Sequence, residues 1–213
     1  MTSRTSDFFP AAYFRRQDES PGSRFHSVAR EEPYLDRLEQ ASFQDLALRL
    51  VEPGGNLLDL LAGAHSYLPP ALRPTALVGL GLNPVEMGRN PQLSAFLVQD
   101  LNQQPLLPFA DGAFDAALCT CGVQYLVRPV ELFSEVKRVL KPGGVFLVSF
   151  TRGCYPGKTI AFWLATRPRQ RQLLVGRYFA ASGGWQEAQM APALPPPGAP
   201  ELDGLHAVWA RKN

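Results

Sequence analysis

Three short stretches between Asp100 and Gly144 decide the fold of this chain. They read Asp100-Leu101-Asn102, Leu107-Pro108-Phe109-Ala110-Asp111-Gly112-Ala113-Phe114-Asp115 and Arg138-Val139-Leu140-Lys141-Pro142-Gly143-Gly144. Asp111 and Gly112 favour a turn, after which Phe114 is the kind of residue that is buried where a strand begins. Gly143 and Gly144 favour a second turn, directly before another apolar run. These stretches predict a strand that is joined through a helix to the next strand.

The helix of this unit is marked by its charges as well as by its apolar residues. We predict it over residues 129–140, because Pro129 suits the first turn and Glu131 and Glu135 lie toward the positive end. Basic residues follow toward the negative end. The apolar positions form one stripe, which predicts that the helix packs on a sheet. They are Leu132, Phe133, Val136, Val139 and Leu140.

Short apolar runs recur on both sides of this unit and alternate with more polar segments. Each run is bounded by Gly, Pro or Asp, which is typical of strands buried on both faces of a parallel sheet. The chain therefore predicts an α/β fold. We expect strands over residues 56–61, 76–80, 95–100, 114–121 and 145–150.

The C-terminal third carries weaker patterns. We predict a helical region over residues 159–181 that Pro168 interrupts, followed by strands over 185–190 and 205–211. Five prolines in residues 192–200 exclude regular structure there and predict an exposed loop.

Composition and charge limit the kind of protein. A chain of 213 residues with 46% hydrophobic content suits one α/β domain with a full core. A formal charge of +2 lacks the concentrated basic footprint of proteins that bind nucleic acid or membrane surfaces, so we expect neither partner. The chain has one local cluster of arginines, which a solvated helix face explains. It consists of Arg167, Arg169, Arg171 and Arg177.

Cysteine usage and hydropathy suggest a location in the cell. The three cysteines are an odd number in a chain without a recognisable signal peptide, which fits a reducing compartment. No apolar run approaches the ~20 residues that a helix needs to cross a bilayer. We therefore expect a soluble, cytoplasmic protein.

The three opening stretches together closely resemble the second half of the nucleotide-binding domain of class I methyltransferases, which use S-adenosylmethionine (SAM). Within that superfamily the chain is similar to the methyltransferase type 11 group, although its glycine-rich loop is degenerate. The resemblance extends back to the strand at 56–61 and forward to the last strand. It implies a Rossmann-like class I methyltransferase fold, with a seven-stranded, mostly parallel sheet, an antiparallel last strand and helices on both faces.

The resemblance also suggests how the chain is organised. The first thirty residues predict an extended or partly ordered arm, and a leucine-rich segment then predicts a helix that ends before Pro53. Related folds often place a lid over the substrate at this point. We therefore expect an arm and helix over residues 1–50 that act as a lid, and a methyltransferase-like domain over 51–213. The leucine-rich segment carries Leu35, Leu38, Phe43, Leu46, Leu48 and Leu50.

Nine residues are expected to bind the cofactor. A ligand of an open parallel sheet binds beyond the carboxyl ends of the strands. The resemblance implies that Asp100 accepts a hydrogen bond from the adenine amino group, while the backbone amide of Leu101 reads the ring. Asp100 also suits a purely structural role as a loop cap. The nine are Asp59, Gly63, Gly81, Leu82, Asn83, Asp100, Leu101, Cys119 and Thr120.

Two features depart from the family pattern. Leu61 and His65 stand at two positions of the glycine-rich loop where the family has glycine, which permits close approach and positive φ. Gly81 stands where the family offers an acid to the ribose hydroxyls. Asn83 could contact the ribose instead, or serve as a helix N-cap. On this basis, Gly81→Asp is predicted to tighten SAM binding.

No catalytic residue can be named from the sequence. By resemblance, Gln124 and Tyr125 lie in the region that faces the methyl acceptor, and His26 and His65 titrate closer to neutral pH than a phenol does. Cys119 and Cys121 are predicted to share one face of a strand, and without a second ligand pair they do not predict a metal site.

The sequence thus predicts SAM-dependent methyl transfer to a small-molecule acceptor. The alternative is a non-catalytic relative that uses the same fold for binding or scaffolding. The altered loop and Gly81 keep that alternative open, and the sequence identifies neither the acceptor nor the oligomeric state.

Overall fold

A seven-stranded sheet forms the centre of the protein, in the order β3-β2-β1-β4-β5-β7-β6. The computed structural model describes residues 4–191 and 204–213, so the loop predicted over 192–200 lies outside the described residues. Strands β1 to β5 run parallel, and β7 is antiparallel to both of its neighbours. The predicted mostly parallel sheet with an antiparallel last strand is therefore confirmed. Its strands are β1 (Asn56–Leu60), β2 (Ala76–Gly81), β3 (Ala95–Val98), β4 (Phe114–Thr120), β5 (Leu140–Phe150), β6 (Gln189–Ala191) and β7 (His206–Arg211).

The strand boundaries differ most from the sequence prediction in β5 and β6. Strand β5 begins at Leu140 rather than at Val145, because Leu140 pairs with Phe114 before the register shifts at a bulge. Strand β6 is shorter than predicted, since Trp185 forms only an isolated bridge with Lys212. Both differences arise from pairing with distant strands, which local sequence patterns do not record.

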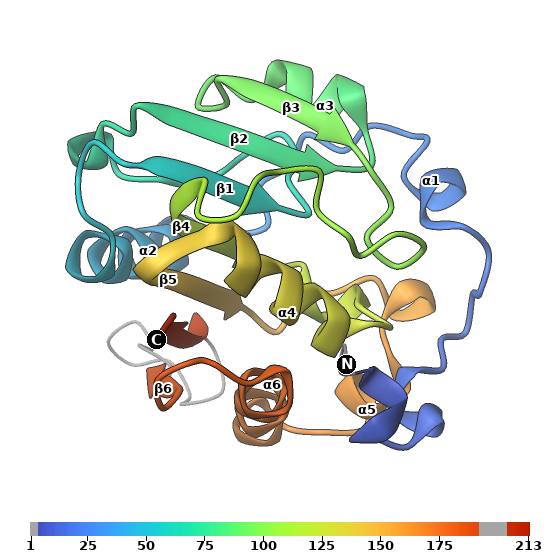
Figure 1. Cartoon of the computed structure of the whole chain (residues 1–213). Helices are drawn as coiled ribbons and strands as arrows, with labels where there is room; N and C mark the ends of the chain where they lie inside the picture. Colours follow the sequence, from blue (N-terminus) through green and yellow to red (C-terminus); the bar gives the residue numbers. More distant parts are fainter. Residues whose placement is uncertain (1–3, 192–203) are drawn as a thin grey trace.

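One face of the sheet is covered by α4 (Pro129–Val139) and α6 (Pro168–Ser182), and the short α5 (Ala161–Leu164) directly precedes α6. Figure 1 shows α4 in front of the sheet. The predicted stripe is fully buried, and Phe133 packs edge-to-face on Phe146 and Phe179, with ring centroids 4.9 and 4.8 Å apart. The helical region predicted over 159–181 is interrupted before Pro168 as expected, and Pro168 begins α6, as suits a residue without an amide hydrogen.

The opposite face carries α2 (Arg37–Leu50), which lies behind the sheet in Figure 1. Asp36 and Glu39 form a capping box at its start. Phe43 and Leu46 are buried, whereas Leu38 and Leu48 of the same leucine-rich segment are 52% and 46% exposed. Helix α2 thus packs into the hydrophobic cluster under the sheet, although the sequence placed it with the lid.

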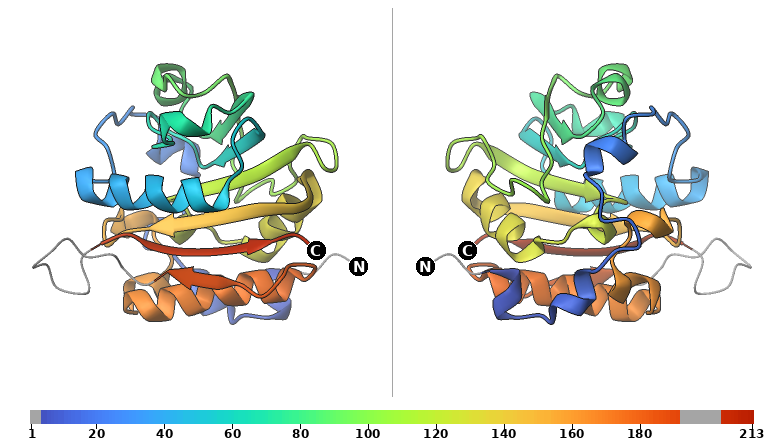
Figure 2. Two further views of the ribbon diagram at one scale, coloured as in Figure 1. Left: turned by 90° about the vertical axis from the view of Figure 1, so that its left-hand side faces the viewer. Right: turned by 90° about the vertical axis from the view of Figure 1, so that its right-hand side faces the viewer.

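The N-terminal arm consists of short turns: η1 (Thr5–Asp7), η2 (Ala11–Phe14) and α1 (Gly22–Phe25). Phe9 and Phe14 join the core around Tyr178, and the hydroxyl of Thr5 donates a hydrogen bond to Glu131 on α4. From there the arm rises toward α1 at the carboxyl edge of the sheet (Figure 2). Its first part is therefore anchored to the core before its second part reaches that edge.

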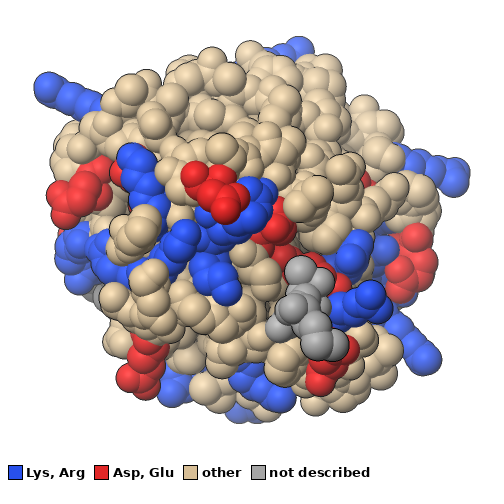
Figure 3. Space-filling view, viewed as in Figure 1, with Lys and Arg blue, Asp and Glu red and all other residues tan. Residues whose placement is uncertain are grey.

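Charged side chains are spread over the surface. On the face shown in Figure 3, basic and acidic groups are interspersed. In the predicted basic cluster, the guanidinium groups of Arg171 and Arg177 lie over the rings of Trp163 and Phe9. Within residues 4–191 and 204–213, no helix has the length and apolar character to span a bilayer.

Candidate functional site

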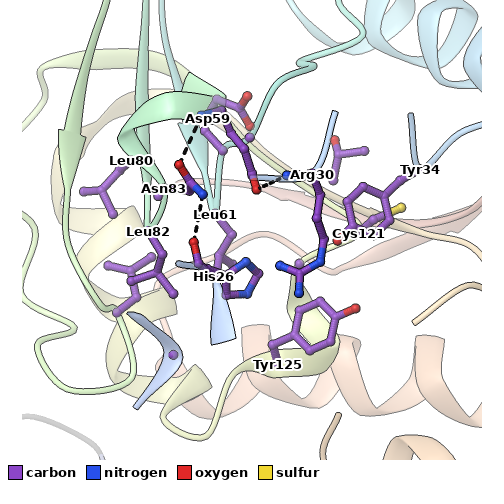
Figure 4. A pocket seen from close by; sticks show the side chains of 18 of the residues that line it. His26, Arg30, Tyr34, Asp59, Leu61, Leu80, Leu82, Asn83, Cys121 and Tyr125 are labelled. Atoms are coloured by element: carbon purple, nitrogen blue, oxygen red, sulfur yellow. Dashed lines mark hydrogen bonds between the residues drawn. The ribbon is translucent and has the colours of Figure 1, made fainter. Parts of the chain in front are cut away.

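The main pocket lies at the carboxyl ends of β1 to β4 and has two walls. One is formed by the loops that follow these strands, residues 61–66, 82–86, 99–102 and 121–125, and we call it the strand-end wall. The other is formed by residues 22–34 of the arm, which we call the arm wall. Figure 4 shows side chains from both walls converging on the same space. This is where a parallel sheet of this kind binds ligands.

The loop after β1 keeps a glycine-like backbone without the glycine. Leu61 has a φ of 56°, in the left-handed region that glycine usually supplies. The amide of Ala62 donates to the carbonyl of Leu80 at 3.0 Å, which holds the loop against β2. Gly63 and His65 both line the pocket, and the His65 ring stacks on Tyr67. Leu61 therefore adopts a left-handed backbone conformation for which glycine is usually needed.

Asp59 supplies a buried carboxyl group beneath this loop. It is 4% exposed and accepts a hydrogen bond from the Ser66 hydroxyl at 2.6 Å. Burial raises its pKa to about 7, although the Ser66 hydrogen bond opposes the shift. The carboxyl group at this position thus changes its charge near neutral pH.

The end of β2 contradicts the expectation for Gly81→Asp. A Cβ at Gly81 would lie 2.2 Å from the carbonyl oxygen of Ala62 and 3.0 Å from the sulfur of Met87. Any side chain here would meet the β1 loop instead of extending into the pocket, so an added carboxylate cannot reach a ligand without moving backbone. Glycine is required at position 81 because the end of β2 lies against the loop that follows β1.

Asn83 is the N-cap of α3 (Pro84–Arg89), as one of the two sequence interpretations proposed. Its side-chain oxygen accepts from the amides of Val85 and Glu86 at 2.8 and 3.2 Å. Its amide group donates to the carbonyl of His26 at 2.8 Å, the contact drawn in Figure 4. Asn83 therefore joins the strand-end wall to the arm wall, and its contact with a ligand stays a prediction.

Asp100 and Leu101 follow β3 and line the pocket, as predicted. One Asp100 oxygen accepts the amide of Asn102 at 2.9 Å, so the residue does cap its own loop. A Cβ at Gly22 would lie 2.8 Å from Leu82 and 3.3 Å from the other Asp100 oxygen. A glycine at position 22 thus lets the arm pass close over this end of the pocket.

The segment after β4 differs from the prediction in two respects. Thr120 lines the pocket, but Cys119 is buried in the cluster under α4. Cys121 has a φ of 53° and packs into the cluster under α2, so the two cysteines do not share a face. The left-handed turn at Cys121 places its side chain on the opposite face of the sheet from the one that strand alternation predicts.

Tyr125 lines the pocket, whereas Gln124 is fully buried and donates to the carbonyl of Cys121. Burial raises the pKa of Tyr125, and its hydroxyl accepts the amide of Tyr155 at 3.0 Å. A phenol with a raised pKa is protonated at neutral pH, so Tyr125 does not serve as a base there.

The arm wall presents His26, Arg30 and Tyr34 to the pocket. Arg30 extends between His26 and Tyr34 (Figure 4), and its guanidinium lies 5.0 Å from the centroid of the Tyr155 ring. Burial, together with Arg30 and Lys158, lowers the pKa of His26 to about 4, so this imidazole is neutral at pH 7. Tyr13 and Phe14, which the sequence assigned to the lid, pack away from the pocket on Phe162 and Tyr178.

A few hydrogen bonds hold the arm wall in place. The amide of Arg30 donates to Glu86 at 2.8 Å, and the amide of Tyr34 donates to the hydroxyl of Tyr67 at 2.7 Å. Lys158 is 3% exposed and donates to the carbonyl of Ser20 at 2.6 Å. The three side chains that hold the arm, those of Glu86, Tyr67 and Lys158, also line the pocket.

Sequence reasoning missed several lining residues. Glu86, Arg30, Tyr34, Tyr67 and Lys158 all face the pocket, and none stands in the predicted set. For Glu86 a signal existed, because it lies three residues after the N-cap Asn83 on a helix that starts at the strand ends. The other four have no local signal, since they reach the pocket only through the path of the chain.

Comparison with known proteins finds a methyltransferase domain over part of the chain. Residues 66–148 match the model of the family described as "Methyltransferase domain". A demethylmenaquinone methyltransferase of Renibacterium salmoninarum is 34% identical over 102 residues, which are 46% of this chain and 41% of that protein. An uncharacterized methyltransferase of Synechocystis sp. is 36% identical over 121 residues, which are 52% of each protein. The aligned part of the chain thus spans about half, or less, of these relatives.

Solved structures agree on the fold. A SAM-dependent methyltransferase from Aquifex aeolicus has a TM-score of 0.60 at 16% identity and covers 86% of this chain and 95% of its own. One from Mesorhizobium loti has a TM-score of 0.59 at 22% identity and covers 81% and 98%. A methyltransferase domain thus matches residues 66–148, and the fold of the chain is similar to that of these SAM-dependent methyltransferases.

Proposed function

We propose that this protein binds SAM in the main pocket and transfers its methyl group to a small-molecule acceptor. The observation that carries the proposal is the convergence of Asp59, Gly63, Asp100 and Leu101 on one cavity at the carboxyl edge of the sheet. These residues come from the ends of two strands, β1 and β3, which lie on either side of β2 in the sheet. Their convergence supports one extended ligand that contacts both strand ends.

The chemistry of the pocket fits an adenosyl ligand. Asp100 and the Leu101 amide would hold the adenine, and Leu82 would pack against its face. The backbone around Gly63 would hold the methionine part, since Leu61 keeps the conformation that this loop needs. When bound, SAM supplies a methyl group that is already activated by its sulfonium. The protein then has to align the acceptor, exclude water and, where required, accept a proton.

The residues around the acceptor side support a small molecule. Tyr34, Tyr67 and Tyr125 line that side, and the arm covers it, so the space suits a compact acceptor rather than a polymer. The relatives named demethylmenaquinone methyltransferases support the same class of acceptor at low identity. We propose His26, which lines the pocket, as the proton acceptor for an oxygen or nitrogen nucleophile; its lowered pKa keeps the imidazole unprotonated at pH 7 and also makes it a weaker base than a free imidazole.

We also propose a reducing, cytoplasmic location. Cys119, Cys121 and Cys154 are free thiols, and the first two are buried. A buried thiol in an apolar surrounding has a raised pKa and is unreactive, as the raised pKa of Cys119 illustrates.

The test of this function is calorimetric titration of the full chain with SAM and with S-adenosylhomocysteine (SAH). Binding of both, followed by transfer of labelled methyl from SAM to hydroquinone and phenol acceptors, is the expected result. Binding without any transfer would favour the alternative of a non-catalytic binding protein. If neither ligand binds, both SAM binding and methyl transfer are ruled out.

A further inference from the structure

The end of β2 leaves a gap in the chemistry of the pocket. Gly81 has no side chain and no space for one, and Leu82 is apolar. Asn83 uses its side-chain oxygen for two backbone amides of α3. The segment that directly follows β2 therefore offers no side-chain acceptor to a ligand, unless one comes from further along the chain.

Glu86 fills this gap from α3. It is 8% exposed and lines the pocket, one helical turn after Asn83. Its Oε1 accepts the Arg30 amide at 2.8 Å, and its Oε2 lies 3.2 Å from where a Cβ on Gly63 would be. In the part of the chain that the structure describes, no protein donor reaches Oε2. This oxygen therefore faces the remaining glycine of the β1 loop with its hydrogen-bonding capacity unused.

The other carboxyl groups of the pocket have different surroundings. Asp59 accepts the Ser66 hydroxyl beneath the β1 loop, and Asp100 accepts the Asn102 amide at the end of β3. Glu32 is exposed on the arm. Glu86 alone among these four combines burial with a position at the end of β2.

We propose that Glu86 accepts hydrogen bonds from the vicinal hydroxyls of the ribose of SAM, in place of an acid at the end of β2. This inference rests on the proposed function. In sheets that bind nucleotides, a carboxylate beyond the second strand has this role because its two oxygens match two adjacent hydroxyl donors. Glu86 reaches the same region from the first turn of the following helix, where Gly81 cannot.

Two further observations support this role. Burial raises the pKa of Glu86, which means that the carboxylate lacks full solvation and gains from new hydrogen-bond donors. The same carboxylate holds the arm through Arg30, so a ligand at Oε2 and the arm at Oε1 share one side chain. Ligand binding then orients the group that fixes the arm wall.

The decisive experiment measures the affinity of wild type and Glu86→Gln for SAH and for its 2′,3′-dideoxy analogue. The glutamine keeps an oxygen for the Arg30 amide but loses the charge and one acceptor. Because hydrogen bonds to a charged group are the stronger ones, we expect the SAH dissociation constant to rise about tenfold in the variant. For the dideoxy analogue, wild type and variant should have equal dissociation constants, because the interacting hydroxyls are gone.

Glu52→Gln is the matched control, since it makes the same change at an exposed carboxylate outside the pocket and should alter neither affinity. Circular dichroism verifies folding, and Glu86→Asp replaces the glutamine variant if that one unfolds. An equal loss for SAH and its dideoxy analogue would overturn the ribose contact while SAM binding stands. Unchanged SAH affinity would overturn it as well. If wild type does not bind SAH at all, the proposed function fails first, and this inference with it.

Discussion

The two walls of the pocket are built on different principles. The strand-end wall follows from the sheet, whose parallel strands deliver Asp59, Gly81 and Asp100 to one edge through a continuous ladder and two hydrophobic clusters. The arm wall depends on individual hydrogen bonds, such as those from Arg30 to Glu86 and from Tyr34 to Tyr67. One wall is fixed by the core, and the other by polar side chains that also line the pocket.

This difference indicates which substitutions should change the stability of the protein and which should change only ligand binding. A core substitution should weaken the strand-end wall by unfolding the whole protein, whereas a polar substitution at the pocket should change binding or the arm while the fold persists. Of the residues 1–50 that were predicted to act as a lid, α2 belongs to the core, whereas the segment 22–34 lines the pocket. Movement of those residues remains a prediction.

The largest effect is expected from Phe133→Ala, beneath the strand-end wall. Phe133 is fully buried between α4, α6 and the sheet, so its truncation should lower the free energy of unfolding by ~3 to 5 kcal/mol. Chemical denaturation measures this, and Leu38→Ala, at a 52% exposed position, is the control, with an expected change within about 0.5 kcal/mol. If the denaturation midpoint of Phe133→Ala equals that of wild type, the strand-end wall is not stabilised by the core in the way proposed.

The next effect concerns Gly81, where the end of β2 touches the loop that follows β1. Because a Cβ would lie 2.2 Å from the Ala62 carbonyl, Gly81→Asp should destabilise the fold by ~1 to 3 kcal/mol and abolish SAH binding. Gly81→Ala, which introduces the same Cβ without charge, should show the same loss of binding. Thermal unfolding and calorimetry test both variants. A folded Gly81→Asp protein with tighter SAH binding would restore the expectation from the sequence.

Asp100→Ala should separate binding from folding at the same wall. Its carboxylate is proposed to accept the adenine amine, and a hydrogen bond to a charged group contributes ~1.5 to 3 kcal/mol. We therefore expect the SAM dissociation constant to rise about tenfold or more at an unchanged melting temperature. Superimposable titration curves for wild type and variant would reduce Asp100 to a cap for the Asn102 amide.

The two walls should respond to pH in opposite directions. Asp59, whose folded pKa is raised from 3.8 to about 7, keeps its proton only in the folded state over that range, so its contribution makes stability fall as pH rises. His26, whose folded pKa is lowered from 6.5 to about 4, is protonated only in the unfolded state between these values, so its contribution makes stability rise with pH.

Removing each group separately should therefore tilt the pH dependence in opposite senses. Asp59→Asn is expected to make stability rise more steeply between about pH 4 and 7, and His26→Gln to make it rise less or fall. Unfolding free energies measured at several pH values test this. If the unfolding free energies of both variants and of wild type change with pH in the same way, Asp59 and His26 do not make opposite contributions.

The smallest effect is expected at the arm wall itself. Tyr67→Phe removes the hydroxyl that accepts the Tyr34 amide, a hydrogen bond that contributes ~1 kcal/mol. Amide hydrogen exchange should become faster in residues 22–34 of the variant and slower in wild type when SAH is added. The segment 129–139 serves as an internal reference, since it lies in the core. Equal protection of 22–34 with and without SAH would count against a lid.

Local patterns in the sequence were sufficient for the framework. The stripe of the helix after Pro129, the turn at Asp111 and Gly112, and the short apolar runs specify their own structure, because period and turn chemistry act over a few residues. The parallel order of strands then sends Asp59, Asp100 and Leu101 to one edge, so most of the strand-end wall could be named in advance.

Only the tertiary structure decided the rest, because it depends on contacts between residues far apart in the sequence. Whether Leu61 adopts a left-handed backbone, and whether Gly81 has room for a side chain, is settled by β2 meeting the β1 loop. Cys121 changes sides at a left-handed turn that alternation does not predict. Arg30 meets Glu86 across 56 residues of chain, and such a meeting exists only once the arm has folded over the sheet.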